Sequence, residues 1–345
     1  MSEVRASGGE LDDAAQLLAS ARARLSAAMA DLALPEALRL SDRQRITVSH
    51  LLRRLVGDVE DELRSALAAH FAAEEEAPLR AALSSASLAI AVPLLEGGAL
   101  ADPGLFALLL RRTEEHRLAR SAPERRLLTE LAGDPDEEVA AAAVALLIGE
   151  SRRLDAFQEP LLAEGDLPAE TAHALAWTVA AALRTYLIAR HGVPAAAADS
   201  AVTASASAWL ARYDEGAGAD ALARRLALRL DERGRLDDAF LLRSVEEGVF
   251  PLFLAGLSLR TGLDLPALWE LLPESAGRGA AILLRAARVG RPAAASILLG
   301  LAGREEAVAG QLDVYDSIDA ADAHRRVLLW KLDPAYRSAV ARLAS

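Results

Sequence analysis

The chain has 345 residues, a formal net charge of −12 and no cysteine. The absence of cysteine excludes disulfides, thiolate metal sites and cysteine nucleophiles. An acidic balance of this size disfavours nonspecific nucleic-acid binding and anionic membranes, because both need a positive protein surface. Hydrophobic residues make up 52% and aromatic residues only 4%, which suits a large core of closely packed helices with small side chains.

The N-terminus gives no sign of a targeting segment. Its first residues, MSEVRASGGELDD, lack the apolar core of a secretory signal. No stretch approaches the roughly 20 apolar residues of a membrane helix, since the apolar run over residues 171–183 is followed directly by Arg184. We therefore expect a cytoplasmic protein without membrane contact, and a helical segment over residues 1–40.

Helical periodicity runs through almost the whole chain, and strand alternation is nearly absent. A long helix is predicted from steps of three and four between apolar residues. These residues are Val48, Leu52, Leu55, Val59, Leu63, Leu67 and Phe71. Pro78 is then expected to open the next helix.

Asp-Pro pairs predict where two later helices begin. In Asp102–Pro103 and Asp134–Pro135 we expect the aspartate to be the N-cap and the proline to be the first helical residue. Glu137 and Glu138 then lie in the first turn, where the helix dipole favours negative charge. The alternative is a cation site in this acidic run. It lacks the glycine-centred spacing of a calcium loop and a nearby histidine, so the helix start is our interpretation.

Behind this acidic run, the stretch DPDEEVAAAAVALL resembles the second helix of a HEAT repeat. Three further stretches, LLRRLVGDVEDELRSALAAHF, AIAVPLLEGGALADPGLFALLL and EEHRLARS, resemble a family of HEAT-like proteins common in alphaproteobacteria. That family is catalogued as a domain of unknown function. The resemblance covers residues 41–150 closely and 236–301 more loosely. It implies a HEAT-like fold, and it brings no established activity and no catalytic residues.

The sequence of the second half predicts two long helices, over residues 168–190 and 194–213. It also indicates a domain boundary near residues 159–166. We therefore expect an all-α protein that forms a curved solenoid. A HEAT-like helical-repeat domain is expected over residues 41–158 and a C-terminal helical domain over residues 159–345.

The segment RITVSHLLRRL offers a candidate phosphoacceptor, His50. A Ser-His pair in a long helix resembles the phosphoacceptor helix of bacterial histidine kinases. The helical wheel places His50 opposite the apolar face, beside Arg53 and Arg54. However, Leu51 stands where that motif has glutamate, and no proline follows the arginine pair. The alternative interpretation is an ordinary exposed histidine.

His116 is a second candidate, expected in a short helix between Arg112 and Arg117. It could contact Glu114 or Glu115, but the sequence places no pocket or partner for a catalytic base.

Four arginines form a candidate anion-binding stripe. Arg278, Arg285, Arg288 and Arg291 follow each other at steps of seven, three and three. On one helix face they would present converging guanidinium groups to an anion. The alternative is a solvated outer face of the array.

Helical arrays expose broad concave surfaces and lack buried catalytic clefts. The leading hypothesis is therefore a non-catalytic scaffold or regulator that binds a cytoplasmic protein and uses no cofactor or metal. The alternatives are histidine phosphotransfer through His50 and anion or nucleic-acid recognition through the arginine stripe. Candidate interaction residues are Phe106, Glu114, Arg117, Trp269, Arg285 and Arg288.

Overall fold

The structure is a computed structural model, and it describes residues 40–71, 77–85, 88, 90–122, 125–272, 278–302, 305–333, 335–337, 339 and 343. Nearly all of the helical segment expected over residues 1–40 lies outside this described part. The chain divides into two units, Met1–Arg45 and Ile46–Ser345. In the first unit, residues 40–45 contain a capping box. Ser41 N–H donates to Gln44 Oε1 at 2.9 Å, and Gln44 N–H donates to Ser41 Oγ at 3.3 Å.

The described residues confirm the all-α prediction. They contain no β-strand, and one isolated antiparallel bridge pairs Leu154 with Pro160. The α-helices are α2 (Asp42–His70), α3 (Ala77–Leu83), α4 (Ala91–Glu96), α5 (Pro103–Ser121), α6 (Leu127–Ala132), α7 (Glu137–Ser151), α8 (Ala169–His191), α9 (Ala195–Arg212), α10 (Ala219–Glu232), α11 (Asp238–Glu246), α12 (Phe250–Thr261), α13 (Leu265–Leu271), α14 (Arg278–Ala286), α15 (Arg291–Ala302), α16 (Glu305–Ser317) and α17 (Ala320–Val327). Short 3-10 turns are η3 (Glu164–Asp166), η4 (Glu215–Ala217) and η5 (Leu328–Lys331).

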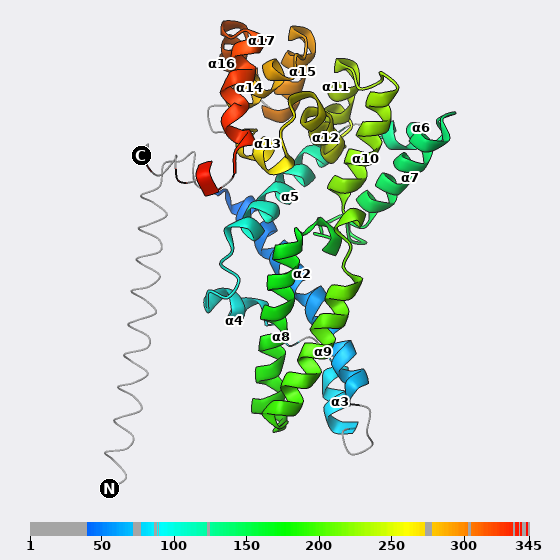
Figure 1. Cartoon of the computed structure of the whole chain (residues 1–345), viewed down its shortest axis with the longest axis vertical. Helices are drawn as coiled ribbons and strands as arrows, with labels where there is room; N and C mark the ends of the chain where they lie inside the picture. Colours follow the sequence, from blue (N-terminus) through cyan, green and yellow to red (C-terminus); the bar gives the residue numbers. More distant parts are fainter. Residues whose placement is uncertain are drawn as a thin grey trace. The chain divides into compact units, whose positions relative to one another are not determined.

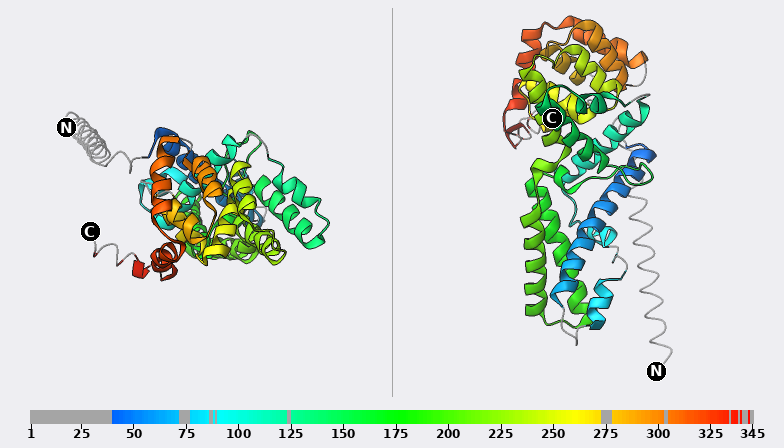
Figure 2. Two further views of the ribbon diagram at one scale, coloured as in Figure 1. Left: turned by 90° about the horizontal axis from the view of Figure 1, so that it is seen from above. Right: turned by 90° about the vertical axis from the view of Figure 1, so that its right-hand side faces the viewer.

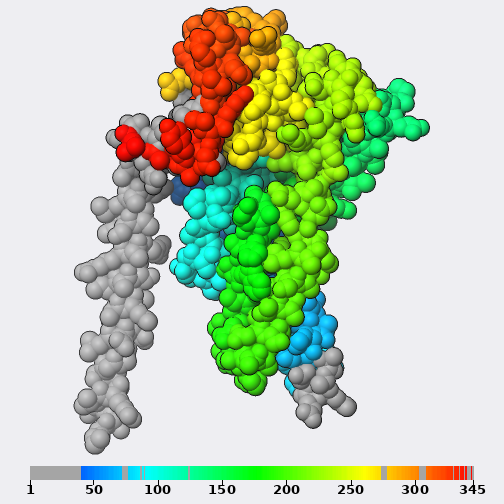
Figure 3. All heavy atoms as spheres, in the orientation of Figure 1, coloured from blue at the N-terminus to red at the C-terminus, as the bar shows by residue number. Residues whose placement is uncertain are grey.

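The first of three hydrophobic cores joins α2 with α8, α9 and the first half of α5. Figures 1 and 2 show α2 running along the α8–α9 pair, and Figure 3 shows α8 and α9 in contact along their lengths. The apolar face predicted for α2 is confirmed, because every residue of the predicted stripe is buried. The two long helices of the second half are also confirmed. The first ends at Gly192, whose φ of 64° gives the left-handed conformation typical of a helix end.

The other two cores lie among the remaining helices. The third core joins α6 and α7 with α10 and α12. The second core is formed by α11 to α17 together with Leu118 of α5. Within it, α14 packs against α16 and α17, and α11 packs against α15.

Helix α5 links the first two cores. Leu105 and Leu109 pack in the first core, whereas Leu118 packs in the second. Charged residues lie buried between these two apolar ends. The expected boundary between residues 158 and 159 does not coincide with a division between cores. The first core joins Leu109 with Leu162, and the third joins Leu146 with Leu222.

The N-cap predictions have different outcomes. Asp102 is confirmed as the N-cap of α5, and its carboxylate accepts a hydrogen bond from Gly104 N–H at 2.7 Å. Asp134 as the N-cap of α7 is wrong. The helix begins two residues later, because Asp136 accepts from the N–H groups of both Glu138 and Val139, at 3.0 and 3.2 Å.

The prediction of four arginines on one helix face is also wrong. Helix α14 ends at Ala286, and Arg291 begins α15. Between them Arg288 has a φ of 55°, the left-handed conformation that terminates helices. Val289 N–H donates to Leu284 O at 3.0 Å and closes this turn. The spacing of the four arginines matched one helix, but a turn between α14 and α15 interrupts it.

Candidate functional site

The six interaction residues expected from the sequence lie at separate places. Phe106 packs against the first core and Trp269 against the second, and both are half-buried. On α5, Glu114 and Arg117 form a local ion pair at 2.7 Å. The remaining two lie near the α14–α15 turn.

Of these two arginines, Arg285 is engaged in packing. It donates to Ile318 O at 2.7 Å, and its guanidinium lies 4.9 Å from the centre of the Tyr315 ring. Arg288 is exposed. No described feature assembles these residues into one site.

His50 is exposed on α2, as are Arg53 and Arg54, while Val48 and Leu52 are buried. The predicted outward orientation of His50 is therefore confirmed. Phosphotransfer through it stays a prediction.

A buried ion network occupies the middle of α5. Glu115 accepts hydrogen bonds from Arg111 Nε at 2.7 Å and from Arg153 Nη2 at 2.5 Å. All three residues are less than a tenth exposed. Arg111 also forms a bidentate pair with Asp220 of α10, one arm at 2.7 Å. The network thus fastens α5 to α10 and to the segment that follows α7.

Arg153 is the second branch point of this network. Its Nη1 donates to Glu150 at 2.8 Å and its Nε to Asp166 at 3.0 Å. Asp166 in turn accepts from Ala219 N–H at 2.9 Å, so the same carboxylate holds Arg153 and the first residue of α10. Each guanidinium arm of Arg153 therefore has a carboxylate partner.

The charges of this network change the acidity of its members. Burial alone raises the pKa of Glu115, but the positive charges of Arg153, Arg111 and Arg112 outweigh it and hold this pKa at about 2. Burial, and then repulsion from Arg153, lowers the pKa of Arg112 to about 10. Glu115 is therefore a carboxylate, and the positive charge of Arg112 is incompletely neutralised.

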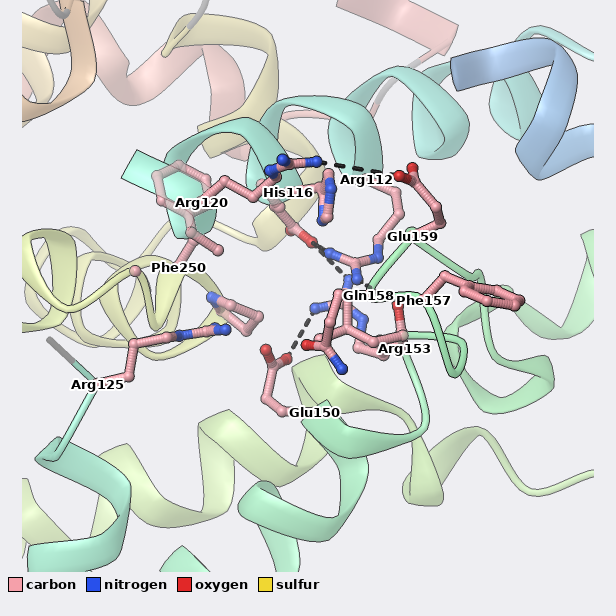
Figure 4. Close-up of a pocket in the computed structure, with 15 residues that line it drawn as sticks. Arg112, His116, Arg120, Arg125, Glu150, Arg153, Phe157, Gln158, Glu159 and Phe250 are labelled. Atoms are coloured by element: carbon pink, nitrogen blue, oxygen red, sulfur yellow. Dashed lines mark hydrogen bonds and ion pairs between the residues drawn. The ribbon is translucent and has the colours of Figure 1, made fainter. Parts of the chain in front are cut away.

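A cavity of about 250 Å³ adjoins the network (Figure 4). Arg112, His116 and Arg153 line it and are buried, whereas Arg120 and Arg125 line it and are exposed. His116 therefore lies in a pocket, which the sequence alone did not reveal. It lies on one continuous helix, Pro103–Ser121, and not on the short one that the sequence suggested.

A tightly bonded loop follows α7 and borders the cavity. The Asp155 carboxylate accepts from Phe157 N–H at 2.8 Å and from Glu159 N–H at 2.9 Å, and Leu161 N–H donates to Arg153 O at 2.8 Å. Gln158 adopts a left-handed φ of 63°. Phe157 is 86% exposed, and Figure 4 shows its ring directed away from the arginines. This loop holds a large aromatic side chain in solvent.

Helix α7 has an apolar face without a partner in the described chain. Val144, Leu147 and Ile148 are 41%, 40% and 48% exposed. Val139, Ala143 and Leu146 of the same helix are buried. Beside this face lies a groove of about 200 Å³. It is lined by Leu128, Leu147, Leu154 and Val249, together with Arg125, Glu150 and Ser151.

Sequence reasoning missed the network and the loop. One signal was present, because the stripe that starts at Leu105 and Leu109 continues at helical spacing onto Arg112 and His116. Polar residues on an apolar stripe indicate a buried polar cluster. Its partners Arg153, Asp166 and Asp220 are distant in sequence, and no local pattern connects them.

A second titratable cluster involves η3. Burial, and then the negative charge of Glu62, raise the pKa of Glu164 to about 7. Trp209 Nε1 donates to Glu164 at 3.2 Å, and Arg212 pairs with Glu62 at 2.8 Å. Protonation of Glu164 relieves the repulsion between the two carboxylates.

No group of three or more metal-ligating side chains occurs within the described part of the chain. None of the helices described there is both long enough and apolar enough to cross a membrane.

The fold and this network define an all-helical protein with an arginine-lined cavity. Residues 90–329 match the model of a family described as an uncharacterised protein conserved in bacteria (DUF2336), and the chain belongs to this family. The match spans residues 90–329. It therefore includes the region between 150 and 236 that the sequence resemblance left out, and it begins after residues 41–89, which that resemblance covered. No curated protein and no solved structure matches the chain.

Proposed function

We propose that the chain is a non-catalytic interaction protein of the HEAT-like helical-repeat type, which binds another cytoplasmic protein. The stacking of helices supports the repeat part of this proposal. Helix α7 packs against α6 and α10, and α10 packs against α12. Helices that each contact their neighbours in this way leave long faces free for partners.

The exposure of the Phe157 side chain is the observation that carries the proposal. Hydrogen bonds to Asp155 fix its loop, so little conformational entropy is lost when the ring enters a partner's apolar pocket. Exposed aromatic residues dominate the binding energy of many protein interfaces. Leu147 and Ile148 supply further exposed apolar surface on α7. The partner is therefore a protein that presents a pocket for one aromatic ring and an apolar ridge or helix beside it.

Site-specific photo-crosslinking tests this proposal. A benzoylphenylalanine at position 157 should crosslink one partner protein in the native cell. The same residue at Ile46, which is 70% exposed, is the matched control. With the purified partner, Phe157→Ala should weaken binding at least tenfold, whereas Ile46→Ala should leave it unchanged. Equal crosslinking at both positions, or unchanged affinity of Phe157→Ala, would reject the proposal.

A further inference from the structure

The arginine-lined cavity contains more positive charge than its own carboxylates neutralise. Glu115 and Glu150 line it and are each hydrogen-bonded to Arg153, at 2.5 and 2.8 Å. Glu159 also lines it and lies 4.0 Å from Arg120. The two close carboxylate contacts therefore both go to Arg153, whereas Arg112 and Arg120 have only the long contacts of 3.9 and 4.0 Å among the described residues.

Arg112 is the first arginine left without a close carboxylate. It donates to two neutral carbonyl oxygens, Leu161 O at 2.9 Å and Arg153 O at 2.6 Å. Its nearest approach to Glu115 is 3.9 Å, through Nη1. A guanidinium that is buried beside Arg153 and incompletely neutralised favours the approach of an anion.

Arg125 is the second arginine of the cavity that has no close carboxylate among the described residues. It lines the cavity and is exposed, and it forms no hydrogen bond or ion pair with any other residue that the structure describes. Figure 4 shows its side chain extending toward the interior of the cavity, across from Arg112. Arg120 is 56% exposed, and among the residues that the structure describes its one carboxylate contact is the long one with Glu159. Three guanidinium groups can thus reach one bound anion without breaking a close ion pair.

The remaining lining restricts the size and the body of the ligand. Phe250, Pro251 and Leu154 supply apolar surface. A volume of about 250 Å³ lies below the roughly 300–1,000 Å³ of pockets for drug-sized molecules. An inorganic ion alone would leave this apolar wall without contacts.

We infer that this cavity binds a small organic oxyanion. Its phosphate or carboxylate contacts Arg112, Arg120 and Arg125, and its apolar body lies against Phe250 and Pro251. The inference does not depend on the proposed protein partner. Phe157 also lines the cavity, but its ring is directed away from the arginines, and the anion contacts are assigned to Arg112, Arg120 and Arg125.

Titration of the full-length protein at low salt tests the site. Phenyl phosphate, benzoate and inorganic phosphate serve as probes, with calorimetry for all three and phosphorus NMR for the two phosphates. Phenyl phosphate or benzoate should bind at least tenfold more tightly than inorganic phosphate, and whichever binds more tightly identifies the head group. The double substitution R120Q/R125Q should weaken that binding at least tenfold. Both residues are exposed, so the fold should be retained, and circular dichroism checks this.

The matched control is R190Q/R224Q, which removes two exposed arginines outside the cavity lining and should leave affinity unchanged. Three outcomes would overturn the inference. These are no binding of either organic anion, equal losses in the two double variants, and inorganic phosphate that binds as tightly as phenyl phosphate. A protein partner that still depends on Phe157 would leave the proposed function intact in each case.

Discussion

Arg153 and Glu115 are 38 residues apart in the sequence and form a 2.5 Å hydrogen bond in which both side chains are buried. Three helices, a loop and a 3-10 turn meet at this pair, since Arg111 adds Asp220 of α10 and Arg153 adds Glu150 of α7 and Asp166 of η3. Burying a charge is costly unless it is paired. The network therefore stabilises one relative position of these elements and holds open the cavity beside it.

Glu115→Gln should destabilise the protein by about 3 kcal/mol or more, because it leaves buried guanidinium groups short of one negative charge. The neighbouring Glu114→Gln is the control. Glu114 pairs with Arg117, which is 44% exposed, so its substitution should cost less than about 1 kcal/mol. Urea denaturation measures both. Equal losses would mean that the network contributes no more than a surface ion pair.

The contrast between Glu114 and Glu115 shows how far the sequence could predict this protein. Helical periodicity identified α2, α8 and α9, because each buries an apolar face that is visible as local spacing. On α5, periodicity does not predict that Glu115 is buried, since its burial depends on Arg153 and on a loop far along the chain. The stripe on α5 points to buried polar residues at Arg112 and His116, but no local pattern connects them with Arg153, and so the candidate site was missed.

The predicted start of α7 was wrong for a related reason. Asp134 and Asp136 are both good N-cap residues, and nothing in the local sequence ranks them. In the structure Asp134 pairs with Arg235 and Asp136 with Arg233, and both arginines lie directly after α10. These tertiary partners fix which carboxylate faces the free N–H groups.

Asp136→Ala should lower the melting temperature, because it removes the acceptor for two N–H groups of α7 and a partner of Arg233. Asp136→Asn separates these effects, since asparagine keeps the cap and loses the ion pair. The Asn variant should melt close to the wild type, and EDTA should change neither melt. A large drop with EDTA that calcium reverses would reveal a cation at this acidic run.

Gly248→Ala should destabilise by about 2–4 kcal/mol. Gly248 has a φ of 69°, and an added Cβ would lie 2.6 Å from Ala119 Cα of α5. Gly234→Ala is the matched control, because Gly234 has a φ of 64° and open space around it. It should cost only about 1–2 kcal/mol. If denaturation gives equal losses, the close approach of the α11–α12 turn to α5 is not a constraint on stability.

His50 gives the test between binding and phosphotransfer. As an interaction protein, the wild type should gain no acid-labile phosphate when it is incubated with a phosphorylated receiver domain. His50→Ala should retain the fold, because an exposed side chain loses little on truncation. A label that appears on the wild type and is lost in His50→Ala would replace the interaction hypothesis with a signalling one.

The pKa of Glu164 predicts a pH dependence of stability between pH 4.5 and 7. Its ordinary value is 4.5, and burial together with the charge of Glu62 raises it to about 7 in the folded chain. The folded state therefore holds a proton that the unfolded state releases. This stabilisation is complete below pH 4.5 and is lost as the pH rises through 7.

The lowered pKa of Glu115 has the opposite effect on stability. The stabilisation that its charged form provides is lost only as the pH falls from 4.5 toward 2. From pH 5 to 8, the free energy of unfolding should consequently fall more steeply for the wild type than for Glu164→Gln, which resembles the protonated side chain at every pH. The exposed Glu170→Gln should follow the wild type. Urea denaturation at four pH values measures all three. Parallel curves for the wild type and Glu164→Gln would show that folding does not raise the pKa of Glu164, because a carboxyl group with the ordinary value of 4.5 has lost its proton in both states above pH 5.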